Sequence, residues 1–498
     1  MPKDNKKNIS PFSIDVLKLV TGTTIAQAIG ILASPILTRL YGPEAFGLFA
    51  IFTSITSIIG VIACMRYELA IMLPERDEDA INILGLCMLM VVVITVFTTV
   101  IIFFGGGLIT NLLQASGLKT YLWLVPPFVF ISGIFLALNY WNSRTRQFGR
   151  LSVARITNSF GTTTVQLGAG LSGFTSGGSL IGAGLVGMLV STGVLGLQIW
   201  RDDDVKFKKS VKWRGIIKVM KRYKKFPLID SISALLNTIS WQLPVILLSA
   251  FFSPVIVGFY ALGMRVLQTP MSFIGGAIAQ VFFQRGVKAY HQLNLSIIVA
   301  DIFEILLKIS VFPMLILLIS GWDLFIVIFG YSWGEAGKYA QLLSIWAIFW
   351  FISSPLSTIL SITEKLKTGF FLTVLNISTR FISLLVGGVL GDVFLAIALF
   401  SFSGLFVYGF ACFVFLKYAG LEIKNSFCIM GNVFFDSTLF LIPLIIIKIL
   451  IGNSVIITIS ALIITIIYSV FIFKTDSKFR NLIHELQKIF KNPLVKSF

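Results

Sequence analysis

Charged residues are scarce in this 498-residue chain: Asp, Glu, Lys and Arg together make up 12% of it, against 56% hydrophobic residues. Such a sequence has too little polar surface to cover a core of its own size in water. The shortage of charge therefore excludes a water-soluble domain and predicts a membrane protein.

Side chains that bind metals or form disulfides are also few. The four cysteines have no C-x-x-C pairing and lie in or beside apolar segments (Cys64, Cys87, Cys412 and Cys428), which argues against a disulfide framework and a zinc site. His291 and His484 stand apart, which argues against metal ligation by imidazole. A glycine-rich phosphate loop of the Walker type is missing, so ATP hydrolysis is not expected. We expect no metal and no bound cofactor.

Long apolar segments are what the chain has in abundance, and a segment of about 20 residues crosses the roughly 30 Å of bilayer hydrocarbon. The segment 154–172 is rich in Thr, Gly and Ser, and 321–331 is either a plain loop or an interfacial re-entry. The sequence predicts an all-α polytopic membrane protein with about 14 transmembrane helices. These cover residues 17–38, 46–64, 81–104, 121–140, 154–172, 179–199, 228–250, 255–283, 303–320, 339–361, 369–390, 393–416, 433–451 and 454–473.

Basic residues alternate between the loops in the way that sets membrane topology. With the amino terminus inside, 31 of the 40 Lys and Arg residues fall in inner loops and termini, and three fall in outer loops (Arg39, Lys119 and Lys338). We therefore place both termini in the cytoplasm. The net charge of +18 follows from this topology, and no nucleic-acid partner is expected, because such a surface gathers basic residues on one folded face.

The longest polar stretch inside the chain, residues 201–227, carries eleven of the 40 Lys and Arg residues. Its apolar residues recur at helical spacing (Trp213, Ile216, Ile217, Met220 and Tyr223) and its lysines fill the other face. This pattern is typical of a helix on an anionic membrane surface. We interpret the stretch as a cytoplasmic amphipathic linker that binds anionic lipids and joins two membrane-embedded halves.

A short motif occurs in both halves. Pro43-Glu-Ala-Phe-Gly47 opens the second span, and Pro254-Val-Ile-Val-Gly258 opens the eighth. Because six spans precede the linker, the halves share one orientation, and a pseudo-two-fold axis along the membrane normal would relate two six-helix bundles. We expect bundles at 1–200 and 228–416, the linker at 201–227, two additional helices at 433–473 and a basic cytoplasmic tail at 474–498.

Two arginines fall deep inside predicted spans. Arg265 and Arg380 each lie about eleven residues into a helix, which at 1.5 Å per residue places them roughly 16 Å deep. A charge there needs a partner or a wet cavity, and no carboxylate lies at that depth in the sequence. One interpretation is a cavity that receives an anion, since the guanidinium fork suits phosphate oxygens. The alternative is hydrogen bonding to nearby polar side chains, among them Asn376.

Acidic residues near the span ends allow two interpretations. Asp301, Glu304 and Lys308 share one helix face, and Arg66 lies two residues before Glu68. Each group either forms local ion pairs or relays a proton or sodium ion. We name Asp230, Asp301 and Glu304 as the candidates for ion coupling.

Three stretches of this sequence resemble a known family. Ser34-Pro-Ile-Leu-Thr-Arg39-Leu-Tyr-Gly-Pro-Glu followed by Arg66-Tyr-Glu68-Leu-Ala-Ile-Met-Leu-Pro74, and Trp333-Gly-Glu-Ala-Gly-Lys-Tyr339, resemble the oligosaccharide-flippase branch of the multidrug/oligosaccharidyl-lipid/polysaccharide exporter superfamily. The resemblance implies alternating access around a central cavity. It also implies transport of polyprenyl-diphosphate-linked oligosaccharides, such as O-antigen units, across the bacterial cytoplasmic membrane.

The resemblance further implies that this chain is a transporter and not an enzyme. Arg39, Arg66, Arg265 and Arg380 are then the candidates to meet the diphosphate or to line the cavity. Antiport of protons or sodium ions is the expected energy source, and the polysaccharide polymerase machinery is a candidate partner.

Two alternatives stay open. A drug or cation antiporter of the same superfamily typically carries a carboxylate inside its first span, where this chain has Gln27. A membrane-bound polymerase or glycosyltransferase needs acidic or basic catalytic groups outside the membrane, and the predicted outer loops contain few acids (Glu44, Asp323, Glu335 and Asp392).

Overall fold

The computed structural model describes residues 11–271, 275–292 and 294–480, and within these ranges the chain is helical and has no β-strand. Helices suit the apolar segments because each helix satisfies its own backbone polar groups where water is absent. The chain divides into two compact units. The first contains the chain up to Tyr41 and Leu48–Gln242, and the second contains Gly42–Gly47 and the described chain from Leu243.

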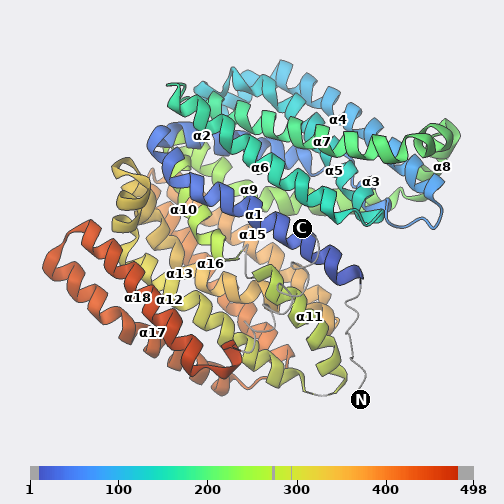
Figure 1. Cartoon of the computed structure of the whole chain (residues 1–498). Coiled ribbons are helices and arrows are strands. Elements are labelled where there is room, and N and C mark those ends of the chain that lie inside the picture. The colour runs from blue at the N-terminus through green and yellow to red at the C-terminus, as the bar shows by residue number, and fades with distance from the viewer. Residues whose placement is uncertain (1–10, 272–274, 293, 481–498) are drawn as a thin grey trace, which may run out of the picture. The chain divides into compact units, whose positions relative to one another are not determined.

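The first unit packs α1 against α6, α6 against α7, and α4 against α5 and α8 (Figure 1). Helices α2 and α9 each have one end in this unit and the other in the second. Its elements are α1 (Pro11–Leu40), α2 (Pro43–Gly60), α3 (Tyr67–Ala70), α4 (Asp77–Leu112), η1 (Ser116–Leu118), η2 (Tyr121–Leu124), α5 (Val125–Arg144), α6 (Phe148–Leu171), α7 (Gly177–Ser210), α8 (Trp213–Arg222), the π-helical turn η3 (Phe226–Asp230) and α9 (Ser231–Phe251).

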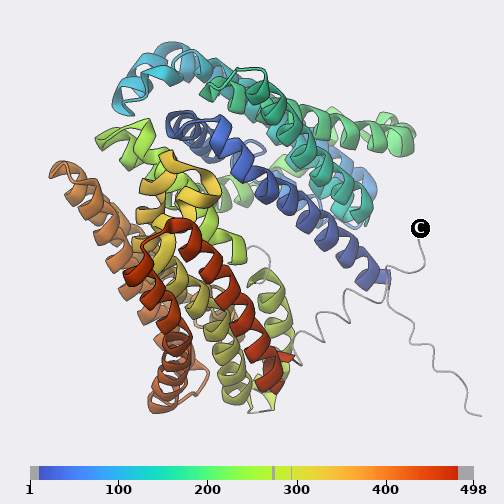
Figure 2. The ribbon, with the colours of Figure 1, turned by 60° about the vertical axis from the view of Figure 1, so that its left-hand side comes forward.

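The second unit is built around α12 and α13, with α10 and α16 against α13 and the α17–α18 hairpin against α12. Figure 2 shows the two helices of this hairpin side by side. Besides the end of α9, its elements are α10 (Pro254–Pro270), α11 (Gly276–His291), α12 (Leu295–Phe329), η5 (Tyr331–Trp333), α13 (Gly334–Leu356), α14 (Ile359–Ile362), α15 (Leu366–Val389), α16 (Val393–Tyr418), α17 (Ile423–Ile451) and α18 (Ser454–Thr475).

The all-α polytopic architecture predicted from the sequence is confirmed, and each of the fourteen predicted spans coincides with helix. Twelve helices in the described ranges are long and apolar enough to cross a membrane. The fifth predicted span, α6, is helical but too polar to be counted among them. The eighth covers α10, which ends at Pro270, and α11, which begins at Gly276, and residues 272–274 between them lie outside the described ranges.

Two segments that the sequence placed outside the spans are partly helical. The segment 321–331, expected as a loop or an interfacial re-entry, is mostly the last part of α12, which runs unbroken to Phe329. The first ten residues of the expected linker belong to α7. The tail expected at 474–498 lies outside the described residues beyond position 480.

The amphipathic helix of the linker exists as α8, but much of its apolar face covers protein instead of lipid. Ile216 and Val219 are buried in the core formed with α4, while Trp213 is 64% exposed. Asn82 of α4 fixes the start of α8, because its amide donates to the Ser210 carbonyl oxygen (3.0 Å) and accepts from the Lys212 amide (3.0 Å). A membrane-surface helix would expose this face, so α8 is a docked part of the first unit.

The two copies of the Pro-x-x-x-Gly motif contact each other within the second unit. A Cβ atom added to Gly47 would lie 1.7 Å from the carbonyl oxygen of Pro254, and one added to Gly258 would lie 2.0 Å from that of Pro43. Both gaps are far below a van der Waals contact, so only glycine fits at either position. The contact is reciprocal, as expected for equivalent helices that meet at a local two-fold axis.

Replacement of Gly47 or Gly258 by alanine should force the two helices apart. Overpacking of this kind costs about 1–3 kcal/mol, so we expect less folded protein in the membrane and a lower melting temperature in detergent. Gly105→Ala is the matched control, because a Cβ at Gly105 meets no atom within 4 Å. Equal melting temperatures for all three variants would show that the crossing is not tightly packed.

Candidate functional site

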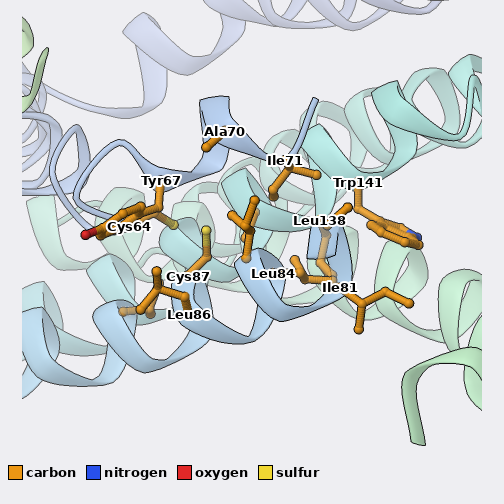
Figure 3. Packing of buried hydrophobic residues seen from close by; sticks show 14 of the residues in the cluster. Cys64, Tyr67, Ala70, Ile71, Ile81, Leu84, Leu86, Cys87, Leu138 and Trp141 are labelled. Carbon is orange, nitrogen blue, oxygen red and sulfur yellow. The ribbon is translucent and has the colours of Figure 1, made fainter. Parts of the chain in front are cut away.

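The turn between α2 and α4 has an unusual backbone. Met65 and Arg66 have φ angles of +50° and +60°, a left-handed conformation that costs about 1–2 kcal/mol at each non-glycine residue. The surrounding core holds it: Cys64 and Tyr67 are buried, and Figure 3 shows both beside Cys87 of α4. The burial of its neighbours on either side fixes the direction in which the Arg66 side chain leaves the turn.

Arg66 pairs with two carboxylates of the first unit. Its Nε donates to Oδ2 of Asp230 (2.7 Å), 164 residues further along the chain, and its terminal nitrogen lies 3.4 Å from Oε1 of Glu68. Asp230 ends the π-helical turn that leads into α9. The structure therefore brings together two residues that the sequence singled out separately, one as a phosphate ligand and one as a coupling acid.

Glu68 is the most buried acid of this group. Its side chain has no exposed area, and its Oε2 atom has no hydrogen-bond partner among the described residues. Burial raises the pKa of Glu68 from 4.5 to about 7, although its own backbone amide and the Arg66 guanidinium act in the opposite direction. A carboxyl with this pKa gains and loses a proton around neutral pH.

Access to the site differs between its members. The side chains of Arg66 and Asp230 are 23% and 43% exposed, so an external anion can approach their pair. The arrangement offers an accessible guanidinium, an exchangeable carboxylate and a buried proton-binding group, and we call Arg66, Glu68 and Asp230 the arginine cluster.

The other predicted phosphate ligands lie apart from one another. Arg39, in the last turn of α1, and Arg265 on α10 are both exposed. Arg380 is only 3% exposed, and it donates to the Tyr408 hydroxyl (2.9 Å). Its guanidinium carbon lies 5.6 Å from the centre of the Phe400 ring and 6.0 Å from those of Trp346 and Tyr408. For Arg380 this geometry favours the alternative of polar and aromatic partners over direct contact with an anion.

Two of the three coupling candidates sit in a separate ion-pair network. Glu304 pairs with Lys308 (2.6 Å) and Lys478 (3.0 Å), and Asp301 pairs with Lys478 (2.7 Å). This geometry favours local pairing over an ion relay. Asp230 is the candidate that lies in the arginine cluster. The sequence showed Glu68 beside Arg66, but its complete burial, which makes it a proton site, has no sequence signal.

The fold defines a class of protein. It is similar to "Lipid II flippase MurJ, inward closed conformation", with a TM-score of 0.72 and 12% identity over 92% of this chain and 98% of that one. It is also similar to an inward-facing multidrug resistance MATE family transporter of the MOP superfamily, with a TM-score of 0.57 and 15% identity over 81% of this chain and 98% of that one. At these identities the likeness shows a shared transporter fold. No curated protein matches this sequence.

The family follows from the sequence itself. Residues 36–338 match the family described as polysaccharide biosynthesis protein. The chain belongs to this family, and the resemblance to the exporter superfamily that the sequence motifs indicated is confirmed.

The raised pKa of Glu68 predicts a dependence of stability on pH. Between about pH 4.5 and 7 the folded protein binds more protons at this site than the unfolded chain does, so the free energy of unfolding decreases as pH rises through this window. Glu68→Gln should remove this contribution. Melting temperatures between pH 5 and pH 8 should therefore fall less in Glu68→Gln than in the wild type.

Glu75→Gln is the control, because Glu75 is exposed in the same loop and its replacement should leave the pH profile unchanged. Identical profiles for Glu68→Gln and the wild type would contradict a proton site at Glu68.

Proposed function

We propose that this protein is a flippase that moves polyprenyl-diphosphate-linked oligosaccharides from the cytoplasmic to the outer face of the bacterial cytoplasmic membrane by alternating access. Its family and its likeness to a lipid II flippase support a lipid-linked substrate. The observation that carries the proposal is the arginine cluster, an accessible guanidinium in one of the basic loops. In this proposal both termini face the cytoplasm, and the product serves a surface polysaccharide such as O-antigen.

The diphosphate competes with Asp230 for Arg66. A guanidinium binds two oxygens of a phosphate at once, and such charge-assisted bonds are stronger than neutral ones. Asp230 is exposed enough to turn toward water when it loses this partner. Arg39 and Arg265 are exposed and remain candidates for further contacts with the substrate. Arg380 is buried, and we assign it a role in stabilising the packing of the second unit.

Glu68 makes diphosphate capture sensitive to pH. A deprotonated Glu68 competes for Arg66, and a protonated one leaves the guanidinium to the substrate. Proton and diphosphate therefore bind cooperatively at this site, and each raises the affinity for the other. This linkage controls capture of the substrate. The proton or sodium antiport expected as the energy source remains a separate proposal, for which Asp230 is the best-placed candidate.

The other candidate functions have weaker support. The likeness to a multidrug transporter is real but lower than that to the lipid flippase, and the first predicted span has Gln27 where drug exporters of the superfamily typically carry an acid. A polymerase or glycosyltransferase needs catalytic groups outside the membrane, and the predicted outer loops contain few acids.

Replacement of Arg66 should weaken substrate capture. Loss of a charged hydrogen bond costs about 1.5–3 kcal/mol, so Arg66→Ala should bind a short-chain polyprenyl diphosphate roughly tenfold to a hundredfold more weakly. Arg66→Lys should recover only part of this affinity because it lacks the planar fork. The control is Arg76→Ala, an exposed arginine of the same loop. An equal loss in both variants would contradict a specific role for Arg66.

Deletion of the protein should leave lipid-linked oligosaccharide on the cytoplasmic face. The measurement is the sidedness of the accumulated lipid in spheroplasts, probed with a membrane-impermeant lectin or glycosidase. Complete units protected from the probe are expected. Units that are exposed outside but not polymerised would overturn the flippase proposal in favour of a polymerase.

A further inference from the structure

A cavity of about 360 Å³ opens between α12, α17 and α18. Its polar side contains Glu304, Lys308, Asp436, Asp476 and Lys478, and its apolar side contains Val433, Tyr468, Phe471 and Ile472. The two sides meet in one pocket, which is the pattern expected for an amphiphilic ligand.

The depth of the cavity matches that of a lipid headgroup. Helix α18 has 22 residues and is therefore roughly 33 Å long, close to the thickness of the bilayer hydrocarbon. The cavity lies at the last two turns of this helix and the residues that follow, from Tyr468 to Lys478. Its floor is fixed by the stack of Phe312 on Tyr468, whose ring centres are 3.7 Å apart.

The charges around the cavity are unequal. Lys308 bonds Glu304 (2.6 Å) and Asp476 (2.7 Å), and Lys478 bonds Glu304 (3.0 Å) and Asp301 (2.7 Å). Asp436 lines the same cavity from α17 and is exposed, and it has no cationic partner among the described residues. Three carboxylates and two ammonium groups line the cavity, and Asp301, outside the lining, also pairs with Lys478. Negative charge is therefore in excess in and beside the cavity, so the missing partner is a cation.

We propose that this cavity binds the headgroup of a zwitterionic membrane lipid with a primary amine, a phosphatidylethanolamine. The ammonium group donates to Asp436, the phosphate lies toward Lys478, and the acyl chains leave along Val433 and Phe471. An anionic headgroup such as phosphatidylglycerol meets the excess negative charge without an ammonium group to offset it. A choline headgroup carries the positive charge but has no N–H to donate to the carboxylate. The proposal does not depend on the transported substrate.

The test is binding of short-chain lipids to the purified full-length protein in detergent, followed by thermal shift and by native mass spectrometry. Dihexanoyl phosphatidylethanolamine should raise the melting temperature, whereas the matching phosphatidylglycerol and phosphatidylcholine should raise it less. Asp436→Asn should weaken binding of the ethanolamine lipid at least about tenfold. Glu422→Gln, which removes an exposed carboxylate just before α17, should leave binding unchanged.

Three outcomes would overturn the proposal. Equal binding of the ethanolamine and glycerol lipids would show a nonspecific lipid contact. Unchanged binding of the ethanolamine lipid to Asp436→Asn would show that Asp436 does not bind the ammonium group. Equally strong binding of water-soluble glycerophosphoethanolamine would show that the ligand is a soluble amine and not a lipid. Transport activity enters none of these measurements, so failure here is distinct from failure of the flippase proposal.

Discussion

The cost of placing charge away from water shapes every polar feature of this chain. An isolated ion in a hydrocarbon-like environment is expensive, so it needs a partner, a change of protonation or a route to water. The described structure uses all three. Lys308 has carboxylate partners, the pKa of Glu68 is raised toward neutrality, and Arg66 stays partly exposed. Arg380 shows a fourth way to lower this cost, because its guanidinium contacts an aromatic ring and donates to a tyrosine hydroxyl.

The same principle attaches the carboxy-terminal hairpin. Near the α17–α18 turn, Asp323 of α12 pairs with Lys448 (3.2 Å) and accepts from the Ser454 hydroxyl (2.7 Å). Near the other end of the hairpin, Lys308 of α12 pairs with Asp476 (2.7 Å). Apolar contact alone gives little preference for one neighbour over another in lipid, because lipid tails are as apolar as leucine. Ion pairs at both ends therefore fix which helix the hairpin joins and at what height.

The sequence predicted the fold far better than the site. The lengths of the apolar segments located the helices, because few structures other than a helix can cross a bilayer. It counted α6 among the spans, although Thr, Gly and Ser make this helix less apolar than the others. The motifs pointed to Arg66 and Asp230, but nothing in the sequence paired residues 164 positions apart. The burial of Glu68 and the aromatic surroundings of Arg380 depend on tertiary packing, which residue spacing does not encode.

The crossing of Gly47 and Gly258 also restricts which substitutions the chain tolerates. Each glycine is required by the backbone of the opposite copy, so a larger residue in one half cannot be offset by a smaller one in the other. A side chain larger than glycine at either position would meet the backbone of the other helix, so a variant that keeps this crossing needs glycine at both positions.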